Sequence, residues 1–310
     1  MNLKGAVVCS SGIGDGLLFS LLGYHLQKKG FITTVFASPL LKDLQPFFPF
    51  FSFIPLPQTP QEIEKIYSSF DRIFIENDNS FRSHFFQKNR KEGVSILFPS
   101  YQESKHGILH PNDVVFSSSQ SIVSNLEEVA FRFFGVHEKS NGMKMPSHLS
   151  YRKENKRVVI HPTSGDPRWS WAKEKYLSLA HQLEKKGFSV VFSLSPSERS
   201  SWLDVPFSVP LFPTLQELAV FLYESGYFIG NDSGIGHLAS SLGIPTLTIG
   251  AKWENLVLWR PDFYVNHLIC PPSWIPNIKK LRWRDRYWQK WISPRRVFRE
   301  FMIFYSQQNR

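Results

Sequence analysis

The chain has 310 residues, of which 42% are hydrophobic, and a formal net charge of +10. This length suits two domains of ordinary size, and the 2 cysteines exclude a disulfide framework. No apolar run approaches the roughly 20 residues of a membrane span, no signal peptide precedes the first strand pattern, and no Cys/His cluster has zinc-ligand spacing, so we expect a cytoplasmic protein without a metal site.

The N-terminal half of the chain alternates strand and helix patterns. Strands are predicted over 5–10, 31–37, 51–56, 72–76, 95–98 and 114–116. Helices are predicted from Asp15 to about Lys29 and over 61–69, 80–91 and 121–134. Such alternation predicts a parallel sheet that is covered on both faces by helices.

A polar segment over 138–156 is the predicted linker, which divides the chain into domains 1–150 and 151–310. Beyond it, strands are predicted over 157–161, 188–194, 207–211, 227–229 and 246–249. Helices are predicted over 171–186, 197–203, 214–224 and 233–242. The sequence therefore predicts an α/β protein with two doubly wound, Rossmann-like domains that present strand-to-helix turns to a cleft between them.

The first chemically informative turn is Ser10-Ser-Gly-Ile-Gly-Asp15, after the first strand. Its glycines allow a tight turn and the close approach of a ligand. Asp15 stands at the start of a helix, where the helix dipole favours a negative charge. The alternative is a purely structural role as a helix cap or first-turn acid. The turn matches neither a dinucleotide fingerprint nor a Walker A loop.

The second turn, His161 to Trp171, follows the first strand of the C-terminal half. The hydroxyl groups of Thr163 and Ser164 can donate hydrogen bonds to phosphate oxygens, and Arg168 can pair with a phosphate through two hydrogen bonds. The alternative is a structural Pro/Gly loop in which Trp171 anchors the next helix.

The third turn, Asn231-Asp-Ser-Gly-Ile-Gly-His237, connects two buried strands through a short helix. Free backbone N–H groups and the positive end of the helix dipole favour a phosphate at such a junction. The alternative gives Asp232 the role of helix N-cap and leaves His237 as an ordinary helix residue.

Together these motifs resemble the ADP-heptose:lipopolysaccharide heptosyltransferases, glycosyltransferase family 9. The stretch from Asp232 to Ala239 is similar to the family's Asp-(Ser/Thr)-Gly-x-x-His-Leu-Ala signature, and His161-Pro-Thr-Ser-Gly165 and Gly14-Asp15 are similar to its other two motifs. The resemblance implies a GT-B fold, with two Rossmann-like domains facing across a cleft. It also implies inverting, metal-independent transfer of a heptose from ADP-heptose to a lipopolysaccharide core or another lipid-linked acceptor. No cofactor is implied besides the nucleotide-sugar donor.

The resemblance also assigns roles to residues of this chain. Asp15 would be the general base, and Arg168 would stand where the family usually has a lysine that stabilises the departing diphosphate. The donor-binding residues would be Thr163, Ser164, Glu198, Asp232, Ser233, Gly234 and His237, with Glu198 at the ribose. Lys252 is a further candidate for a phosphate contact. Two alternatives stay open: a transferase of this fold with another nucleotide-sugar or a protein acceptor, and a nucleotide-sugar-binding protein that has lost catalysis.

The segment 279–310 contains ten basic and two acidic residues, interleaved with aromatic side chains. This composition favours attachment to an anionic membrane surface, where cations meet headgroups and indoles lie at the interface. We expect the protein to attach to the inner face of the membrane and to have no nucleic-acid partner. We also expect the segment 279–310 to cross back to the N-terminal domain. The alternatives are nucleic-acid binding and a helix whose aromatic face packs on the protein while its basic face is solvated.

Overall fold

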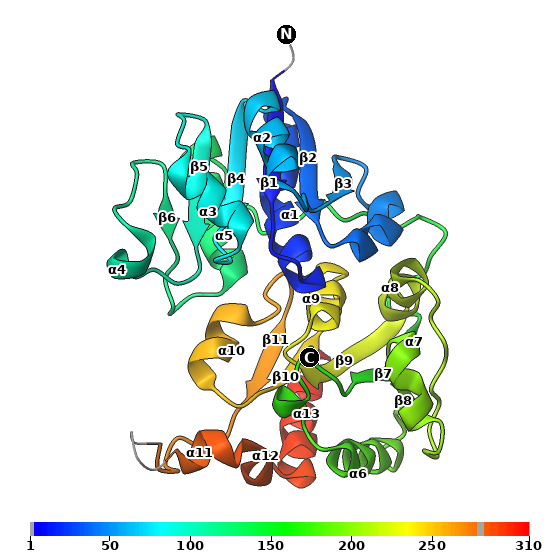
Figure 1. Ribbon diagram of the computed structural model, residues 1–310. Helices are drawn as coiled ribbons and strands as arrows, with labels where there is room; N and C mark the ends of the chain where they lie inside the picture. Colours follow the sequence, from blue (N-terminus) through cyan, green and yellow to red (C-terminus); the bar gives the residue numbers. More distant parts are fainter. Residues whose placement is uncertain (1–2, 278–281, 310) are drawn as a thin grey trace. The chain divides into compact units, whose positions relative to one another are not determined.

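The computed structural model describes residues 3–277 and 282–309 (Figure 1). Three residues of the basic segment, Lys279, Lys280 and Arg310, lie outside the described residues. The chain forms two compact units, Met1–Pro146 (unit 1) and Ser147–Arg310 (unit 2). Both units are built from parallel strands that alternate with helices, which confirms the predicted fold class.

The described residues of unit 1 form a six-stranded parallel sheet in the order β3-β2-β1-β4-β5-β6. Its strands are β1 (Lys4–Val8), β2 (Ile32–Ala37), β3 (Ser52–Pro55), β4 (Arg72–Glu76), β5 (Val94–Phe98) and β6 (Val114–Val115). Its helices are α1 (Ile13–Lys28), η1 (Pro39–Phe47), α2 (Pro60–Ser69), α3 (Phe81–Lys88), α4 (Glu103–His106) and α5 (Ile122–Phe134). The strand order reverses between β1 and β4, and open α/β sheets bind ligands at such a reversal.

The alternating side chains of the strands in unit 1 separate two apolar layers. On one face, Val8 and Ile75 pack with Ile63 of α2 and Phe86 of α3. On the other face, α1 lies beside α5 and buries its leucines completely. Because α1 is fixed along its length, the turn that precedes it is held above the carboxyl end of β1.

The described residues of unit 2 form a five-stranded parallel sheet in the order β11-β10-β9-β7-β8. Its strands are β7 (Glu154–His161), β8 (Ser189–Phe192), β9 (Ser225–Asn231), β10 (Thr246–Ile249) and β11 (Asn266–Ile269). Its helices up to β9 are η2 (Pro167–Trp169), α6 (Lys173–Glu184), α7 (Pro196–Arg199), η3 (Ser200–Trp202) and α8 (Leu215–Tyr223). They are followed by α9 (Gly234–Ser241), α10 (Trp253–Trp259), α11 (Trp283–Arg286), α12 (Trp288–Trp291) and α13 (Pro294–Gln308).

Helices α6 and α13 lie side by side on one face of the sheet of unit 2. The buried face of α13 consists of Val297, Phe301 and Phe304, while Arg295 and Arg299 are exposed. This is the arrangement that the sequence left open as a helix with a packed aromatic face and a solvated basic face. The order of strands reverses between β7 and β9, so the second and third predicted turns begin on either side of this reversal.

Two details differ from the sequence-based expectations. The predicted strand 207–211 is wrong, because only an isolated bridge pairs Val191 with Ser208. Pro206 and Pro210 flank that bridge and have no N–H group to donate to a ladder. In addition, the sequence analysis predicted neither α10 nor β11.

Candidate active site

The Asp15 carboxyl lies in the first turn of α1, where Gly12 is the N-cap residue. It accepts hydrogen bonds from the backbone N–H groups of Gly12 and of Asp15 itself and from the Ser10 hydroxyl. A Cβ atom at Gly12 would lie 2.3 Å from Asp15 Oδ2, so the carboxyl packs where only glycine leaves room. Burial raises the pKa of Asp15, and the charge of Asp78 raises it further.

Glu76 is a second buried carboxyl group of this site, and the sequence analysis missed it. It ends β4, next to β1 in the sheet, is 4% exposed, and accepts a 2.7 Å hydrogen bond from the backbone N–H of Ser10. Burial, and then the charge of Asp15, raise its pKa well above the usual value. The negative charge of ionised Asp15 therefore disfavours ionisation of Glu76. The available signal was an acidic residue directly after the apolar run Ile73–Ile75.

In unit 2, Asn231 at the end of β9 connects three segments of the chain. Its side-chain oxygen accepts hydrogen bonds from the backbone N–H of Trp171 (3.0 Å) and the hydroxyl of Tyr176 (2.7 Å). Its amide nitrogen donates to the carbonyl of Ile249 at the end of β10 (2.9 Å). Asn231 is 1% exposed, so these bonds are shielded from water. The turns that follow β7, β9 and β10 are thus fixed relative to one another.

The turn after β7 brings Thr163 close to Glu198. The Thr163 hydroxyl donates to the Glu198 carboxylate and lies 3.4 Å from Nε2 of His161. His161 is buried, which lowers its pKa, and its Nδ1 donates to the carbonyl of Ser193. Glu198 also accepts the backbone N–H of Ser195 and so closes a capping box on α7. Two predicted donor-binding residues therefore lie together beside a neutral imidazole.

The remaining residues of this turn form hydrogen bonds within the turn. The Ser164 hydroxyl donates to the carbonyl of Asp166 (2.7 Å). The Arg168 guanidinium, 85% exposed, forms an ion pair with the Asp166 carboxylate at 2.6 Å and a further hydrogen bond through Nε at 2.9 Å. Trp171 is buried and donates to the carbonyl of Ile292. Arg168 thus has an intramolecular carboxylate partner in this structure.

The third turn leads into α9, whose N-cap is Ser233 rather than Asp232. The Ser233 hydroxyl accepts the N–H of Gly236 (3.4 Å), Gly234 is the first helical residue, and Asp232 is exposed. His237 is 4% exposed, and burial lowers its pKa to about 4. The imidazole is therefore neutral at physiological pH. The structural alternative for Asp232 as an N-cap is wrong.

The two turns of unit 2 lie at the reversal of strand order, at the same edge of the sheet. A third turn, after β10, adjoins them, because the Lys252 ammonium lies 5.4 Å from the centre of a Trp169 ring. Unit 2 therefore presents hydroxyl groups, a helix N-terminus and the cations Arg168 and Lys252 at the carboxyl edge of its sheet. This combination suits the binding of a phosphorylated ligand.

The chain matches the family model for glycosyltransferase family 9 (heptosyltransferase) over residues 68–252. It is 25% identical over 134 residues to lipopolysaccharide heptosyltransferase 3 of Escherichia coli (strain K12). That alignment covers 40% of this chain and 38% of that protein.

Solved structures share the fold of the whole chain. The E. coli ADP-heptose lps heptosyltransferase II matches with a TM-score of 0.70 and 16% identity, covering 99% of this chain and 100% of that one. The E. coli heptosyltransferase WaaC with ADP matches with a TM-score of 0.67 and 13% identity, covering 97% and 99%. The fold is therefore that of the GT-B heptosyltransferases. Since the family model covers more than half of the chain, this protein belongs to glycosyltransferase family 9, the heptosyltransferase family.

Proposed function

We propose that this protein is an inverting, metal-independent glycosyltransferase that transfers a heptose from ADP-heptose to the core of a lipopolysaccharide or another lipid-linked glycan. The observation that carries the proposal is the clustering of the Thr163 turn and the N-terminus of α9 at the strand reversal of unit 2. The family membership and the ADP bound to the similar WaaC structure support a nucleotide-sugar donor.

In the proposed reaction the residues of unit 2 bind the donor. Thr163, Ser164, Ser233 and the N–H groups that begin at Gly234 hold the two phosphates, and the α9 dipole stabilises their negative charge. Asp232 and His237 line the same site, and His237 acts as a neutral hydrogen-bonding group. Glu198 accepts a hydrogen bond from the ribose hydroxyls after exchanging its bond with Thr163.

Inverting transfer breaks the bond between the anomeric carbon and the diphosphate while the acceptor oxygen forms the new bond. Asp15 takes the proton from the acceptor hydroxyl, and its raised pKa makes it a stronger base than an ordinary aspartate. Arg168 leaves Asp166 to pair with the departing diphosphate. Breaking the ion pair between Arg168 and Asp166 costs little free energy, because the pair is exposed and exposed pairs contribute little to stability.

The proposal is tested by donor profiling and then by turnover. ADP-heptose should raise the midpoint of thermal unfolding in proportion to the logarithm of its concentration, and UDP-glucose and GDP-mannose should not. With ADP-heptose and a truncated lipopolysaccharide acceptor, the enzyme should release ADP. Stabilisation by another nucleotide-sugar alone would overturn the assigned donor. Stabilisation by ADP-heptose without ADP release from any lipid or protein acceptor would overturn the assigned activity.

The low pKa of His237 makes a prediction for donor binding. Because the imidazole is neutral above about pH 5, the dissociation constant for ADP-heptose should stay constant between roughly pH 5.5 and 8. Its folded-state pKa lies below the ordinary value, so the folded protein should lose stability as the pH falls from about 6.5 toward 4. A His237→Gln variant should lose less stability over that range. Affinity that rises steeply between pH 8 and 6 would instead indicate a charged imidazole at the phosphates.

We also propose that α11 and α12 attach the enzyme to the anionic inner face of the membrane. None of the helices among the described residues has the length and apolarity needed to cross a bilayer. Trp283, Tyr287 and Trp291 are 51%, 39% and 37% exposed, and Arg282, Arg286 and Lys290 alternate with them. Exposed indoles beside cations favour an anionic interface.

Membrane attachment predicts that the protein floats with vesicles containing phosphatidylglycerol and not with vesicles of phosphatidylcholine alone. Replacing Trp283 and Trp291 together with alanine should reduce the bound fraction at least about fivefold, because two indoles leave the interface. Phe81→Ala, which removes an exposed ring (44%) from unit 1, is the control and should not change flotation. Equal losses for both variants would contradict the assignment of this surface.

A further inference from the structure

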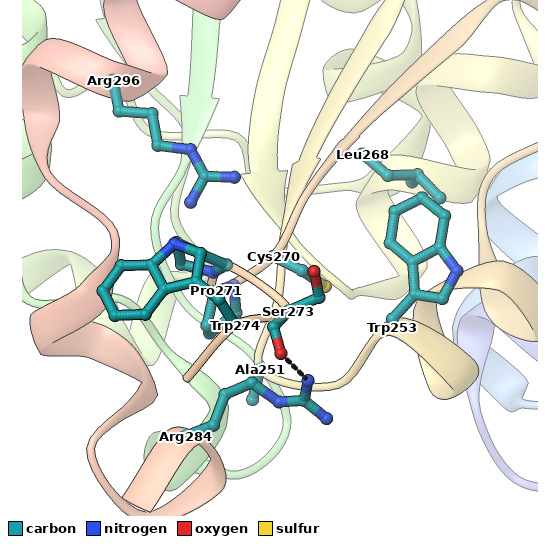
Figure 2. A pocket seen from close by; sticks show the side chains of 10 residues that line it. Ala251, Trp253, Leu268, Cys270, Pro271, Ser273, Trp274, Arg284 and Arg296 are labelled. Atoms are coloured by element: carbon teal, nitrogen blue, oxygen red, sulfur yellow. Dashed lines mark hydrogen bonds between the residues drawn. The ribbon is translucent and has the colours of Figure 1, made fainter. Parts of the chain in front are cut away.

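A cavity opens at the carboxyl edge of the sheet in unit 2, where β10 and β11 end (Figure 2). Its volume is about 460 Å³. It is lined by Ala251, Trp253, Leu268, Cys270, Pro271, Pro272, Ser273, Trp274, Arg284 and Arg296. None of these residues belongs to the donor-binding set proposed above, so the cavity has no assigned role.

Two arginine side chains supply the charge of this cavity. Figure 2 shows the guanidinium groups of Arg284, from α11, and Arg296, from α13, turned toward the loop from Pro271 to Trp274. Among the described residues neither has a carboxylate partner, whereas Arg282 and Arg299 of the same region pair with Asp285 and Glu300. The hydrogen bond from Nη1 of Arg284 to the carbonyl oxygen of Ser273 is long, at 3.5 Å. The cavity therefore has two cations that are free to pair with a ligand.

The position of the Arg296 side chain destabilises the folded protein in two respects. Its Nη1 is buried and has no hydrogen-bond partner among the described residues. It also stands in the first turn of α13, where the helix dipole disfavours a positive charge. A buried, unsatisfied donor destabilises the folded protein unless an acceptor arrives, and an anion would satisfy it.

The other charged or titratable groups near the cavity do not oppose the binding of an anion. Burial raises the pKa of Cys270 to about 12, and the charge of Glu254 contributes in the same direction, while Arg296 and Arg284 oppose it. Cys270 is thus a neutral thiol and offers no negative charge to the arginines. Glu254 is within electrostatic reach of Cys270 but does not line the cavity.

Two indole rings complete the lining. Trp253 and Trp274 are 54% and 77% exposed, although large apolar side chains are normally covered. The negative face of an indole attracts the polarised C–H groups on the apolar face of a sugar ring. A cavity that combines exposed indoles with unpaired guanidinium groups suits a carbohydrate that carries an anionic group.

The cavity adjoins the donor site along the same sheet edge. Neighbouring parallel strands lie about 4.8 Å apart, so the ends of β9 and β11 are separated by roughly 10 Å. Lys252, which stands between the cavity residues Ala251 and Trp253, contacts Trp169 of the turn after β7. A glycan bound in the cavity would therefore extend to the place where the donor sugar is expected.

We propose that this cavity is a subsite for an anionic sugar of the acceptor glycan, a pyranose ring that carries a carboxylate or a phosphate group. Arg284 and Arg296 bind the anionic group, and Trp253 and Trp274 stack on the ring. The inference rests on the proposed function, because the bound sugar is a part of the acceptor.

The test is a titration of the full-length protein followed by NMR of the tryptophan indole N–H signals, with the signals assigned through Trp253→Phe and Trp274→Phe. Glucuronate represents a carboxylated ring, glucose 6-phosphate a phosphorylated ring and glucose the neutral ring. At least one charged sugar should shift the signals of Trp253 and Trp274 and bind at least tenfold more tightly than glucose. The tighter of the two charged sugars identifies the anionic group.

Matched variants locate the binding. Arg296→Gln and Arg284→Gln should each weaken the charged sugar at least tenfold, while Arg295→Gln, the same charge change on an exposed neighbour, should leave it unchanged. Trp274→Ala should weaken it as well, while Trp283→Ala should not. Thermal stabilisation by ADP-heptose should be unaltered in all five variants, which shows that unit 2 is folded.

Three results would overturn the subsite. The first is that glucose binds as tightly as both charged sugars. The second is that inorganic phosphate alone binds as tightly as glucose 6-phosphate. The third is that Arg295→Gln lowers the affinity for the charged sugar as much as Arg296→Gln does. Thermal stabilisation by ADP-heptose distinguishes failure of the subsite from failure of the proposed function. If ADP-heptose does not stabilise the wild-type protein, the donor assignment fails, whereas the sugar titration still reports on the cavity.

Discussion

Replacing Asp15 with asparagine should lower kcat/KM by about 10²–10⁴-fold, the usual contribution of a general base. The amide has nearly the shape of the carboxyl group but cannot accept the proton of the acceptor hydroxyl. Donor binding should be unaffected, because the proposed donor residues belong to unit 2. Initial rates of ADP release and thermal shifts with ADP-heptose measure the two quantities separately.

The stability of the variant provides an internal control. Since burial raises the pKa of Asp15, ionising the group costs free energy in the folded protein, and that cost is present at neutral pH. Asp15→Asn should therefore be at least as stable as the wild type at pH 7. Asp71→Asn, which changes an exposed carboxylate that accepts the backbone N–H of Lys4, should retain full activity. An Asp15→Asn enzyme with an unchanged rate would disprove the assigned base.

The dependence of kcat/KM on pH should report the ionisation of Asp15. The acidic limb of kcat/KM for the wild-type enzyme should lie above the value of about 3.9 that is ordinary for aspartate, because Asp15 has to lose its proton before it can act as a base. Activity should rise as the pH increases through the raised pKa. A limb at or below 3.9 would show that another group controls the step.

Replacing Asn231 with alanine should destabilise unit 2 by about 3–5 kcal/mol, because it leaves the N–H of Trp171, the hydroxyl of Tyr176 and the carbonyl of Ile249 buried without their partner. Affinity for ADP-heptose should fall at least tenfold, since the turns after β7 and β10 lose their common attachment. Urea unfolding followed by circular dichroism and donor titration measure the two effects.

The matched control for this prediction is Asn266→Ala, in β11 of the same unit. Asn266 is half-buried and donates to the carboxylate of Asp262, so its loss should cost only about 1 kcal/mol. Equal destabilisation by the two substitutions would mean that the buried network contributes no more than an ordinary surface hydrogen bond. A destabilised Asn231→Ala protein with unchanged donor affinity would separate the network from the site.

Much of the architecture follows from local patterns in the chain. The strand Arg72–Glu76 and the strand Thr246–Ile249 have the bounds expected from their apolar runs. Alternation of strands with helices identified two parallel sheets, because parallel strands need a long crossover connection, which is usually a helix. The wrong strand over 207–211 shows the limit of the same reasoning, since its apolar residues satisfied the pattern while two prolines removed the N–H groups needed for pairing.

The chemical partners of the site residues could not be predicted in this way. Glu76 lies 61 positions after Asp15, and only the pairing of β4 with β1 brings the two carboxyl groups together. Asn231 binds Trp171 across 60 positions of sequence, and Arg168 found a carboxylate partner, Asp166, that the motif did not reveal. Helix periodicity likewise does not show which aromatic residues near the C-terminus are packed and which are exposed.

By itself the sequence determined the fold class, the three turns at the ends of strands and the resemblance to a transferase family, because each depends on residues that are close together in the chain. The tertiary structure alone decided the raised pKa of Asp15, the network around Asn231 and the cavity lined by Arg284 and Arg296. Burial and charge depend on which distant segments pack together, and that packing is fixed by the order of strands in each sheet.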